Sequence, residues 1–178
     1  MQYIHEYHSP LGVITLASDG DSLIGLWFHG QKYFAETLQC FKQGNTSLPI
    51  FHSAQAWLDC YFRGENPGFM PPISLKGSKF RMDVWKILSE IPYGEVITYG
   101  DIARQLVAQN NLSKMSAQAV GGAVGHNPIS IIVPCHRVVG TNSSLTGYAG
   151  GIEKKIKLLN LEGVDTSKLT IPTKGTAL

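Results

Sequence analysis

A proline-rich segment divides the sequence into two parts with different patterns. It reads Asn66-Pro67-Gly68-Phe69-Met70-Pro71-Pro72. A helix cannot continue through it, because proline lacks a backbone N–H and clashes with the preceding turn. The 178 residues have room for one domain or for two small ones. We therefore expect an interdomain linker here, with the domain boundary near Lys76.

The first part, residues 1–76, has the pattern of short strands. Gly12 to Ala17 and Leu23 to Phe28 are apolar runs rich in β-branched residues, and Ser18-Asp19-Gly20-Asp21 separates them, which predicts a hairpin. From Ser53 to Phe62 the apolar residues recur at helical spacing, which predicts one helix. The pattern favours a strand-rich structural domain.

The second part has the pattern of helices. Ser78 is a suitable cap for a helix that continues to about Glu90. Thr98-Tyr99-Gly100-Asp101 has the S/T-x-x-D/E form, in which two side chains reciprocally satisfy free backbone N–H groups, so a second helix should extend from Tyr99 to about Ala108. The polar residues Gln109 to Ser113 predict a loop.

A third, short helix is expected from Ser116 to Gly125. Its small side chains indicate that something packs very close to it; they are Ala117, Ala119, Gly121, Gly122 and Ala123. Two short helices joined by a turn suggest a helix-turn-helix, although the same pattern also fits two ordinary packing helices. The expected fold class is α+β, with a mainly helical second domain over residues 77–165 and a tail over residues 166–178.

The formal charge of +2 is unevenly divided between the two parts. Residues 1–76 hold four Lys/Arg against six Asp/Glu, which gives −2, and residues 77–178 hold eleven against seven, which gives +4. The second part permits contact with a polyanion without demanding it. The sequence has no run of 18 apolar residues and no basic, apolar leader, so we expect no membrane partner and a cytoplasmic location.

The three cysteines, Cys40, Cys60 and Cys135, match neither a disulfide framework nor a metal-binding pair, which favours a reducing compartment with at least one free thiol. A free cysteine is commonly a small buried hydrophobe, and this is the default for Cys40 and Cys60. Cys135 differs because His136 and Arg137 follow it, and a nearby base or cation favours the nucleophilic thiolate.

The local backbone decides whether His136 can assist Cys135. Ile129 to Val133 should form a buried strand that ends at Pro134-Cys135-His136-Arg137. Adjacent side chains on a strand point to opposite faces. His136 can therefore act on Cys135 only if the backbone turns there or a water bridges them, and spacing alone leaves a reactive and a structural Cys135 equally open.

Linked motifs surround Cys135. They are Val84-Trp85, Ile91-Pro92-Tyr93-Gly94, Thr98-Tyr99, Ala119-Val120-Gly121-Gly122-Ala123, Asn127-Pro128, Pro134-Cys135-His136-Arg137-Val138, Gly147-Tyr148-Ala149-Gly150-Gly151, Leu158-Leu159 and Glu162-Gly163. In these motifs, over about residues 78–164, the chain closely resembles the O6-alkylguanine-DNA alkyltransferases. The resemblance implies a ribonuclease H-like N-terminal domain, a winged-helix-like C-terminal domain and DNA repair by direct damage reversal.

The resemblance implies a role for five residues. Cys135 would attack the O6 alkyl carbon of a damaged guanine and keep the alkyl group as a thioether, in a single turnover. His136 would take the thiol proton through a water, and Glu162 would orient His136. Tyr99 would donate to the leaving guanine and crowd the phosphate so that the nucleotide rotates out. Asn127 would hold the active-site turn together and help to position the base.

The resemblance further implies that the helix Ser116–Gly125 enters the minor groove and that the damaged nucleotide leaves the stack. Val138 and Tyr148 would line the guanine pocket, with Lys155 near its rim. The full set of expected substrate and DNA contacts is Ser116, Ala117, Gln118, Ala119, Gly121, Arg137, Val138, Tyr148, Ala149 and Lys155.

The sequence departs from the family pattern at two of these positions. Gln118 occupies the place of an arginine that usually fills the gap left by the flipped base. Glutamine lacks the cation and the planar stacking surface, which predicts weaker DNA affinity or slower flipping. Ala149 occupies a position where many relatives have a serine whose hydroxyl contacts guanine O6, so backbone N–H groups would serve alone.

The expected partner is double-stranded DNA that contains O6-alkylguanine, with O4-alkylthymine as a further candidate substrate, and the expected state is a monomer. We expect no cofactor. We also expect no metal, because Cys40 and Cys60 do not stand where some relatives bind zinc, and His5 and His8 are lone histidines.

Two other functions stay open from the sequence. One is a regulatory or signalling protein that binds alkylated DNA, in which Cys135 is structural or a redox sensor. The other is a cysteine hydrolase that uses Cys135, His136 and Glu162, and this would require an oxyanion hole and repeated turnover.

Overall fold

The structure is a computed structural model that describes residues 1–43 and 47–173. The last five residues of the expected tail, 174–178, lie outside this range. The chain divides into two compact units, Met1–Lys76 with Pro128–Ile132, and Gly77–Asn127 with Val133–Leu178. The first unit thus includes a short segment from the second half of the sequence.

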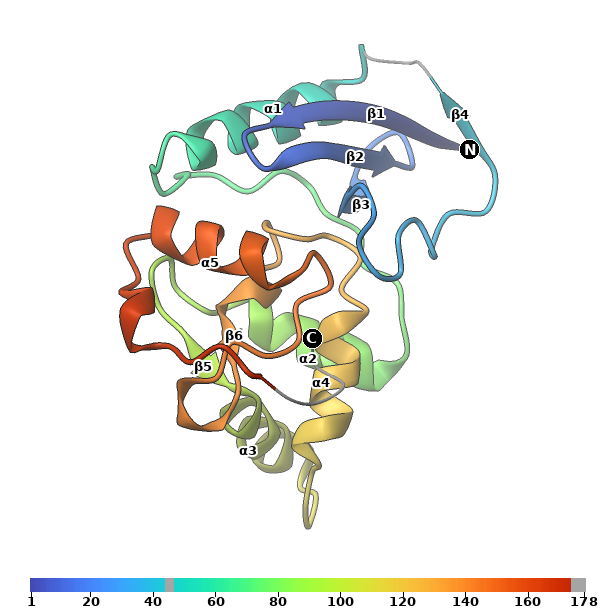
Figure 1. Cartoon of the computed structure of the whole chain (residues 1–178). Coiled ribbons are helices and arrows are strands. Elements are labelled where there is room, and N and C mark those ends of the chain that lie inside the picture. Colours follow the sequence, from blue (N-terminus) through green and yellow to red (C-terminus); the bar gives the residue numbers. More distant parts are fainter. Residues whose placement is uncertain (44–46, 174–178) are drawn as a thin grey trace. The chain divides into compact units, whose positions relative to one another are not determined.

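The first unit contains a four-stranded sheet. Its strands are β1 (Gln2–Ser9), β2 (Gly12–Ser18), β3 (Leu23–Phe28) and β4 (Phe41–Gln43), in the order β3-β2-β1-β4 (Figure 1). The hairpin predicted for the second and third strands is confirmed, because β2 and β3 pair antiparallel. β1 also pairs antiparallel with β2, and β4 lies parallel to β1.

Helix α1 (Pro49–Phe62) packs on β1, β2 and β3. It begins four residues before the predicted start, since Pro49 is suited to a first helical position, where its missing N–H has no intrahelical partner to lose. Its apolar face is buried against the sheet and consists of Ile50, Phe51, Ala54, Trp57, Leu58 and Tyr61.

The second unit is mainly helical. Its elements are α2 (Lys79–Ser89), β5 (Ile97–Thr98), α3 (Tyr99–Asn110), α4 (Ala117–Gly125), β6 (Val138–Val139) and α5 (Ile152–Leu161), with 3₁₀ turns at Cys135–Arg137, Thr141–Ser143 and Thr166–Lys168 (Figure 1). β5 and β6 form a short parallel pair. The indole N–H of Trp85 donates to the Ala123 carbonyl at 2.9 Å and ties α2 to α4.

The predicted caps of these helices are confirmed. The Ser78 hydroxyl accepts from the Arg81 N–H at the start of α2. At the start of α3, the Asp101 N–H donates to the Thr98 hydroxyl at 3.0 Å and the Thr98 N–H donates to the Asp101 carboxylate at 2.8 Å. α3 continues to Asn110, past the predicted end, so the polar loop begins only at Asn111, whose φ of +52° ends the helix.

The buried strand predicted for Ile129 to Val133 is wrong. Ile129 forms an isolated bridge with Leu26, and the next residues turn, with a positive φ of 68° at Ile131. The whole run is nevertheless buried. An apolar run predicts burial, but it does not distinguish a strand from a buried turn.

None of the helices in residues 1–43 and 47–173 is both long enough and apolar enough to cross a membrane.

Candidate active site

Cys135 begins a 3₁₀ turn, so the backbone changes direction at this residue. A turn here is one of the two conditions under which His136 could act on Cys135. The turn is closed by the Arg137 N–H donating to the Pro134 carbonyl at 3.0 Å and by the Val138 N–H donating to the Cys135 carbonyl. Cys135 is 3% exposed and His136 is fully buried. The turn therefore removes the strand geometry that would have separated the two side chains.

Burial and the surrounding polar groups have opposite effects on the pKa of the Cys135 thiol. Burial raises the pKa of the thiol, whereas a hydrogen bond from Asn127, the charge of Lys155 and nearby backbone N–H groups lower it. The Asn127 amide also donates to the Val133 carbonyl at 2.8 Å, which fixes the segment that leads into the turn. Asn127 thus bonds both the thiol and the segment that leads into the turn.

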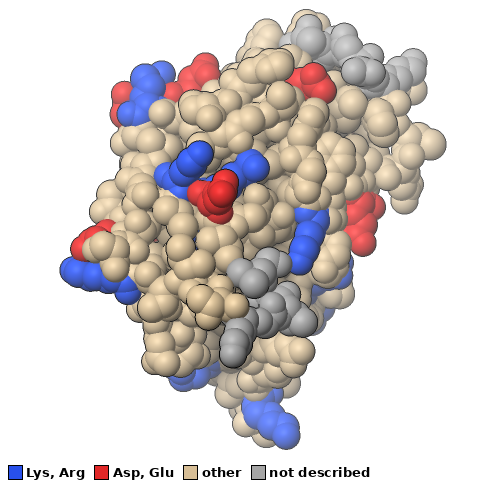
Figure 2. Space-filling view, in the orientation of Figure 1, with Lys and Arg blue, Asp and Glu red and all other residues tan. Residues whose placement is uncertain are grey.

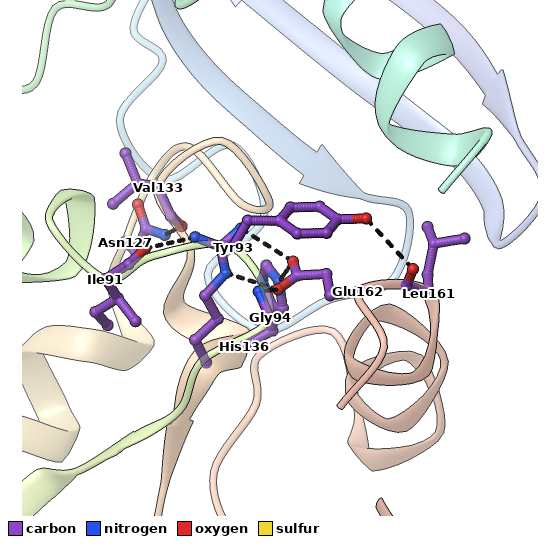
Figure 3. A network of polar contacts seen from close by, with 9 residues as sticks. Ile91, Tyr93, Gly94, Asn127, Val133, His136, Leu161 and Glu162 are labelled. Atoms are coloured by element: carbon purple, nitrogen blue, oxygen red, sulfur yellow. Dashed lines mark hydrogen bonds and ion pairs between the residues drawn. The ribbon is translucent and has the colours of Figure 1, made fainter. Parts of the chain in front are cut away.

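Glu162, which caps the C-terminus of α5, accepts hydrogen bonds from His136, Arg137 and Gly94. His136 Nε2 lies 2.6 Å from Oε1, Arg137 contacts both carboxylate oxygens at 2.8 and 3.1 Å, and the Gly94 N–H donates to Oε2 at 3.1 Å. Figure 3 shows the carboxylate facing His136 and the backbone of Gly94. Although burial opposes ionisation, the bonds from His136 and Arg137 lower the pKa of Glu162 to about 2.

This carboxylate determines the chemistry of His136. Because an ionised carboxylate only accepts, Nε2 carries the proton and the basic lone pair of the neutral ring lies on Nδ1. Burial lowers the pKa of His136, with Arg137 and Lys155 acting in the same direction and Glu162 opposing them. His136 is therefore a neutral imidazole that can accept a proton.

Arg137 lies inside this network, which makes the predicted DNA contact wrong. Besides Glu162, the guanidinium donates to the Ile91 carbonyl at 2.6 Å and lies over the Tyr93 ring, 5.7 Å from its centroid. The side chain is 9% exposed. Tyr93 in turn donates to the Leu161 carbonyl at 3.3 Å, so Arg137 and Tyr93 join the 91–94 segment to the end of α5 (Figure 3).

Lys155 is also buried rather than at the rim of a pocket. It is fully buried on α5, and its ammonium donates to the carbonyls of Val138 at 2.5 Å and Thr146 at 2.8 Å. Burial lowers its pKa to about 8, although Cys135 acts in the opposite direction. The predicted rim position is therefore wrong.

Tyr99 and Tyr148 place two phenols near Cys135. The Tyr99 hydroxyl donates to the carbonyls of Thr146 at 3.1 Å and Gly147 at 3.2 Å, and burial together with Cys135 raises its pKa. Tyr148 is buried, and its ring stands edge-on to His136 with the centroids 6.4 Å apart. The Tyr148 hydroxyl has no hydrogen-bond partner among the described residues.

Four of the five predicted DNA-contact residues of α4 lie at its exposed start, and the fifth, Gly121, is partly exposed one turn later. Ser116, Ala117, Gln118 and Ala119 are exposed, while Val120, Ala123 and Val124 are buried. At Gly121 an added Cβ would lie 3.8 Å from the Tyr99 ring, so α4 passes directly beside this tyrosine. Of the other expected pocket residues, Val138 is fully buried and Ala149 is partly exposed.

The surface charge is modest. On the face drawn in Figure 2, the Lys and Arg side chains lie in small separate groups. Among residues 1–43 and 47–173, no three His, Cys, Asp or Glu side chains are placed to hold a metal ion.

The sequence does not identify the backbone groups that complete the site. The Gly94 N–H, the Ile91 carbonyl and the Thr146 carbonyl each bond a functional side chain. Ile91 and Gly94 belong to a quoted motif, but residue type carries no signal for main-chain contacts. Gly94 itself is required, because its φ is +78° and an added Cβ would lie 3.0 Å from the Glu162 carbonyl.

Taken together, a buried thiol, a neutral imidazole held by a carboxylate and two neutral phenols can support nucleophilic displacement with proton transfer.

Comparisons with known proteins agree with this chemistry. Residues 3–75 match the family model described as 6-O-methylguanine DNA methyltransferase, ribonuclease-like domain, and residues 79–164 match the DNA binding domain of the same family. The Methylated-DNA--protein-cysteine methyltransferase of Haemophilus influenzae is 41% identical over 163 residues, which cover 91% of this chain and 87% of the relative. The relative of the same name in Mycolicibacterium paratuberculosis is 44% identical over 155 residues, 86% of this chain and 88% of the relative.

Solved structures are also similar. The crystal structure of Mycobacterium tuberculosis O6-methylguanine methyltransferase is 40% identical and has a TM-score of 0.77, with 98% of this chain and 97% of that chain covered. The crystal structure of Mycobacterium tuberculosis OGT in complex with DNA is 40% identical and has a TM-score of 0.78, with 94% of each chain covered. These similarities agree with the α+β class.

Proposed function

Since the chain belongs to the 6-O-methylguanine DNA methyltransferase family, we propose that Cys135 is the residue that accepts the alkyl group and that O6-alkylguanine in double-stranded DNA is the substrate. The function is DNA repair by alkyl transfer to a protein cysteine. The observation that carries the assignment to Cys135 is the 3₁₀ turn, which presents this thiol beside a histidine whose tautomer Glu162 fixes.

The transfer is a displacement at carbon. His136 takes the thiol proton through a water, and the thiolate sulfur of Cys135 forms a bond to the alkyl carbon. The bond between that carbon and O6 breaks, and its electron pair stays on the guanine. Tyr99 is suited to donate a hydrogen bond or a proton to the leaving base, because its raised pKa keeps it a phenol. The product is a thioether, which no group in the site can reverse, so each molecule reacts once.

The buried Tyr148 hydroxyl supports binding of a polar base. A buried hydroxyl without a partner costs about 1–3 kcal/mol, and a purine edge that enters beside Cys135 offers acceptors that would satisfy it. The Tyr99 side chain and the Gly147 backbone are close enough that an added Cβ at Gly147 would lie 3.0 Å from the Tyr99 hydroxyl. This close packing favours a flat ligand and admits no bulky substitution at Gly147.

The exposed small residues of α4 support entry of this helix into a DNA groove. Ala117 and Ala119 keep the helix surface low, so that the backbone approaches DNA closely. Gln118, exposed on the same turn, would occupy the gap left by the flipped nucleotide. The small, separate groups of Lys and Arg on the face drawn in Figure 2 fit contacts through the groove and helix N–H groups rather than through many cations.

The test is direct. The full chain is incubated with a duplex that contains one O6-methylguanine, and the intact protein and its peptides are weighed. We expect a gain of one CH2 on the Cys135 peptide, with the Cys40 and Cys60 peptides unchanged as internal controls. Tight binding without any gain in mass would favour a regulatory protein. Repeated turnover of an ester or peptide would favour a hydrolase.

All side chains of the proposed site come from one chain, so we propose that the protein acts as a monomer. Light scattering of the free protein and of its complex with a short duplex measures this. A dimer in the absence of DNA would contradict it.

A further inference from the structure

Lys155 is a buried cation with no carboxylate partner. It is 0% exposed, and it forms no ion pair with an Asp or Glu within residues 1–43 and 47–173. Its two acceptors, the carbonyls of Val138 and Thr146, are neutral. A buried charge that meets only neutral groups is costly, and proteins normally pair it with an opposite charge.

The nearby carboxylate does not fill this role. Glu162 is the one buried acid among the described residues. Both of its oxygens accept from the guanidinium of Arg137, and His136 and the Gly94 N–H bond it as well. The charge of Glu162 is therefore already balanced by Arg137.

Within the described part of the chain, three further groups near Lys155 can carry a negative charge. The phenols of Tyr99 on α3 and Tyr148 on the loop before α5 both have raised pKa values, so they stay neutral. The third is the thiol of Cys135, at the turn that directly precedes Val138. The Asn127 amide and the backbone N–H groups of Cys135 and His136 also bond this thiol, but none of them carries a charge.

We propose that Lys155 is the charge partner of the Cys135 thiolate, so that the ammonium on α5 compensates the anion that the alkyl transfer requires. This inference rests on the proposed function of Cys135 as the nucleophile. It assigns to Lys155 a positioning and electrostatic role from inside the protein, in place of contact with substrate. The reciprocal effects agree with it, since Lys155 lowers the pKa of Cys135 and Cys135 raises that of Lys155.

The two carbonyl bonds couple this charge to the shape of the pocket. Thr146 accepts from both Lys155 and Tyr99, and Val138 lies directly after the turn that carries Cys135. The ammonium therefore joins the turn to the loop of Tyr148. A neutral hydrogen-bond donor in place of Lys155 would keep part of this bonding but would lose the charge. Such a substitution therefore distinguishes an electrostatic role of Lys155 from a structural one.

The experiment compares Lys155→Gln with Lys157→Gln, which removes the same charge from an exposed position on the same helix. Both are made in a full chain with Cys40→Ser and Cys60→Ser, so that Cys135 is the only thiol. The thiolate is titrated by its absorbance near 240 nm without DNA, and a Cys135→Ser chain supplies the background. Methyl transfer from an O6-methylguanine duplex is then measured in a single turnover across pH.

We expect Lys155→Gln to raise the pKa of Cys135 by about one unit or more. Methyl transfer should fall about tenfold near neutral pH and recover as pH rises, since the thiolate is the nucleophile. Lys157→Gln should change neither. An unchanged pKa of Cys135 in Lys155→Gln, with a rate that falls equally at every pH, would overturn the inference while leaving the proposed function intact. Failure of the unsubstituted chain to place methyl on Cys135 would instead overturn the proposed function.

A second measurement keeps the test decisive if Lys155→Gln does not fold. In a full chain with ¹³C-labelled lysine, the titration of Lys155 is followed by NMR with Cys135 present and with Cys135→Ser. Because the coupling is reciprocal, Lys155 should lose its proton at lower pH in Cys135→Ser. Equal titration in the two chains contradicts the pairing.

Discussion

At the scale of single residues, the site separates groups that react from groups that hold them. Cys135 and His136 lie on one turn, and Glu162 fixes the histidine from the end of α5. Arg137 completes the set by neutralising Glu162, so the carboxylate orients His136 without drawing it into the charged form. The basicity of His136 therefore depends on the charge of Arg137 as well as on Glu162.

The first prediction concerns this shared carboxylate. Glu162→Gln leaves the buried Arg137 without its anion, and breaking a buried pair in this way typically costs about 3–5 kcal/mol. We expect a loss of that size in the free energy of unfolding, measured in urea, together with slower methyl transfer. The matched control is Glu162→Gln combined with Arg137→Met, which removes both charges. If the double variant is as unstable as the sum of the single ones, the two residues are not coupled.

The second prediction concerns Gln118, which is exposed on the first turn of α4. Gln118→Arg adds a cation and a planar group at the position that we propose fills the gap left by the flipped base, so it should tighten duplex binding or accelerate repair. Because the residue is exposed, the stability should change little. Duplex affinity at fixed salt and the single-turnover rate measure the effect, and Gln118→Lys controls for charge alone. Unchanged affinity and rate would show that Gln118 does not limit flipping.

Residue type and spacing predict part of this site and miss the rest for a physical reason. The motifs around Cys135 indicate the nucleophile and its histidine, and the turn at Cys135–Arg137 agrees with that role. For Arg137 and Lys155 the expected exposure is wrong, because long basic side chains usually reach water. Here backbone carbonyls accept hydrogen bonds from both side chains, and Glu162 pairs with Arg137. Contacts to main-chain acceptors cannot be recognised from residue types.

At the scale of elements, the caps set where the reactive groups stand. Tyr99 is the first residue of α3, so the capping box of Thr98 and Asp101 also positions the phenol. The sequence predicts α2, α3 and α4 well, because local caps and periodicity define them. It fails at Ile129 to Val133, since the shape of that segment depends on a distant partner strand rather than on its own composition.

The third prediction tests the cap. Thr98→Ala removes one partner of the box and should lower the free energy of unfolding by about 1 kcal/mol. It should also slow methyl transfer, because Tyr99 then loses a fixed position. Thr98→Ser keeps the hydroxyl and should restore both, as followed by thermal unfolding and by the single-turnover rate. A slow Thr98→Ser variant would indicate that the methyl group of Thr98 matters and not the cap.

At the scale of the whole molecule, the buried network makes stability depend on pH. In the folded chain the pKa of Glu162 is about 2, against an ordinary value of 4.5, so the carboxylate stays charged in moderate acid. His136 is held neutral below its ordinary value of 6.5. In both cases the unfolded chain binds a proton that the folded chain refuses, so acid favours unfolding.

The fourth prediction follows from these two groups. The free energy of unfolding should begin to fall as pH drops below about 6.5, and Glu162 alone should remove up to about 3 kcal/mol between pH 4.5 and 2. Urea unfolding at a series of pH values measures the slope. In Glu162→Gln the portion below pH 4.5 should be lost. If that variant shows the same acid slope as the unsubstituted chain, other carboxylates cause it.

The first unit includes Pro128–Ile132, and this has a consequence for the order of folding. Ser130 donates to Gln31 across 99 positions of sequence, and the Leu26 N–H donates to the Pro128 carbonyl at 2.8 Å. Contacts between such distant positions require closure of a large loop, which makes them slow to form. During synthesis the N-terminal strands emerge first and must wait for this segment. Tyr148, Lys155 and Glu162 of the proposed site all follow this segment in sequence. During synthesis every residue of the first unit therefore emerges before the site around Cys135 can be assembled.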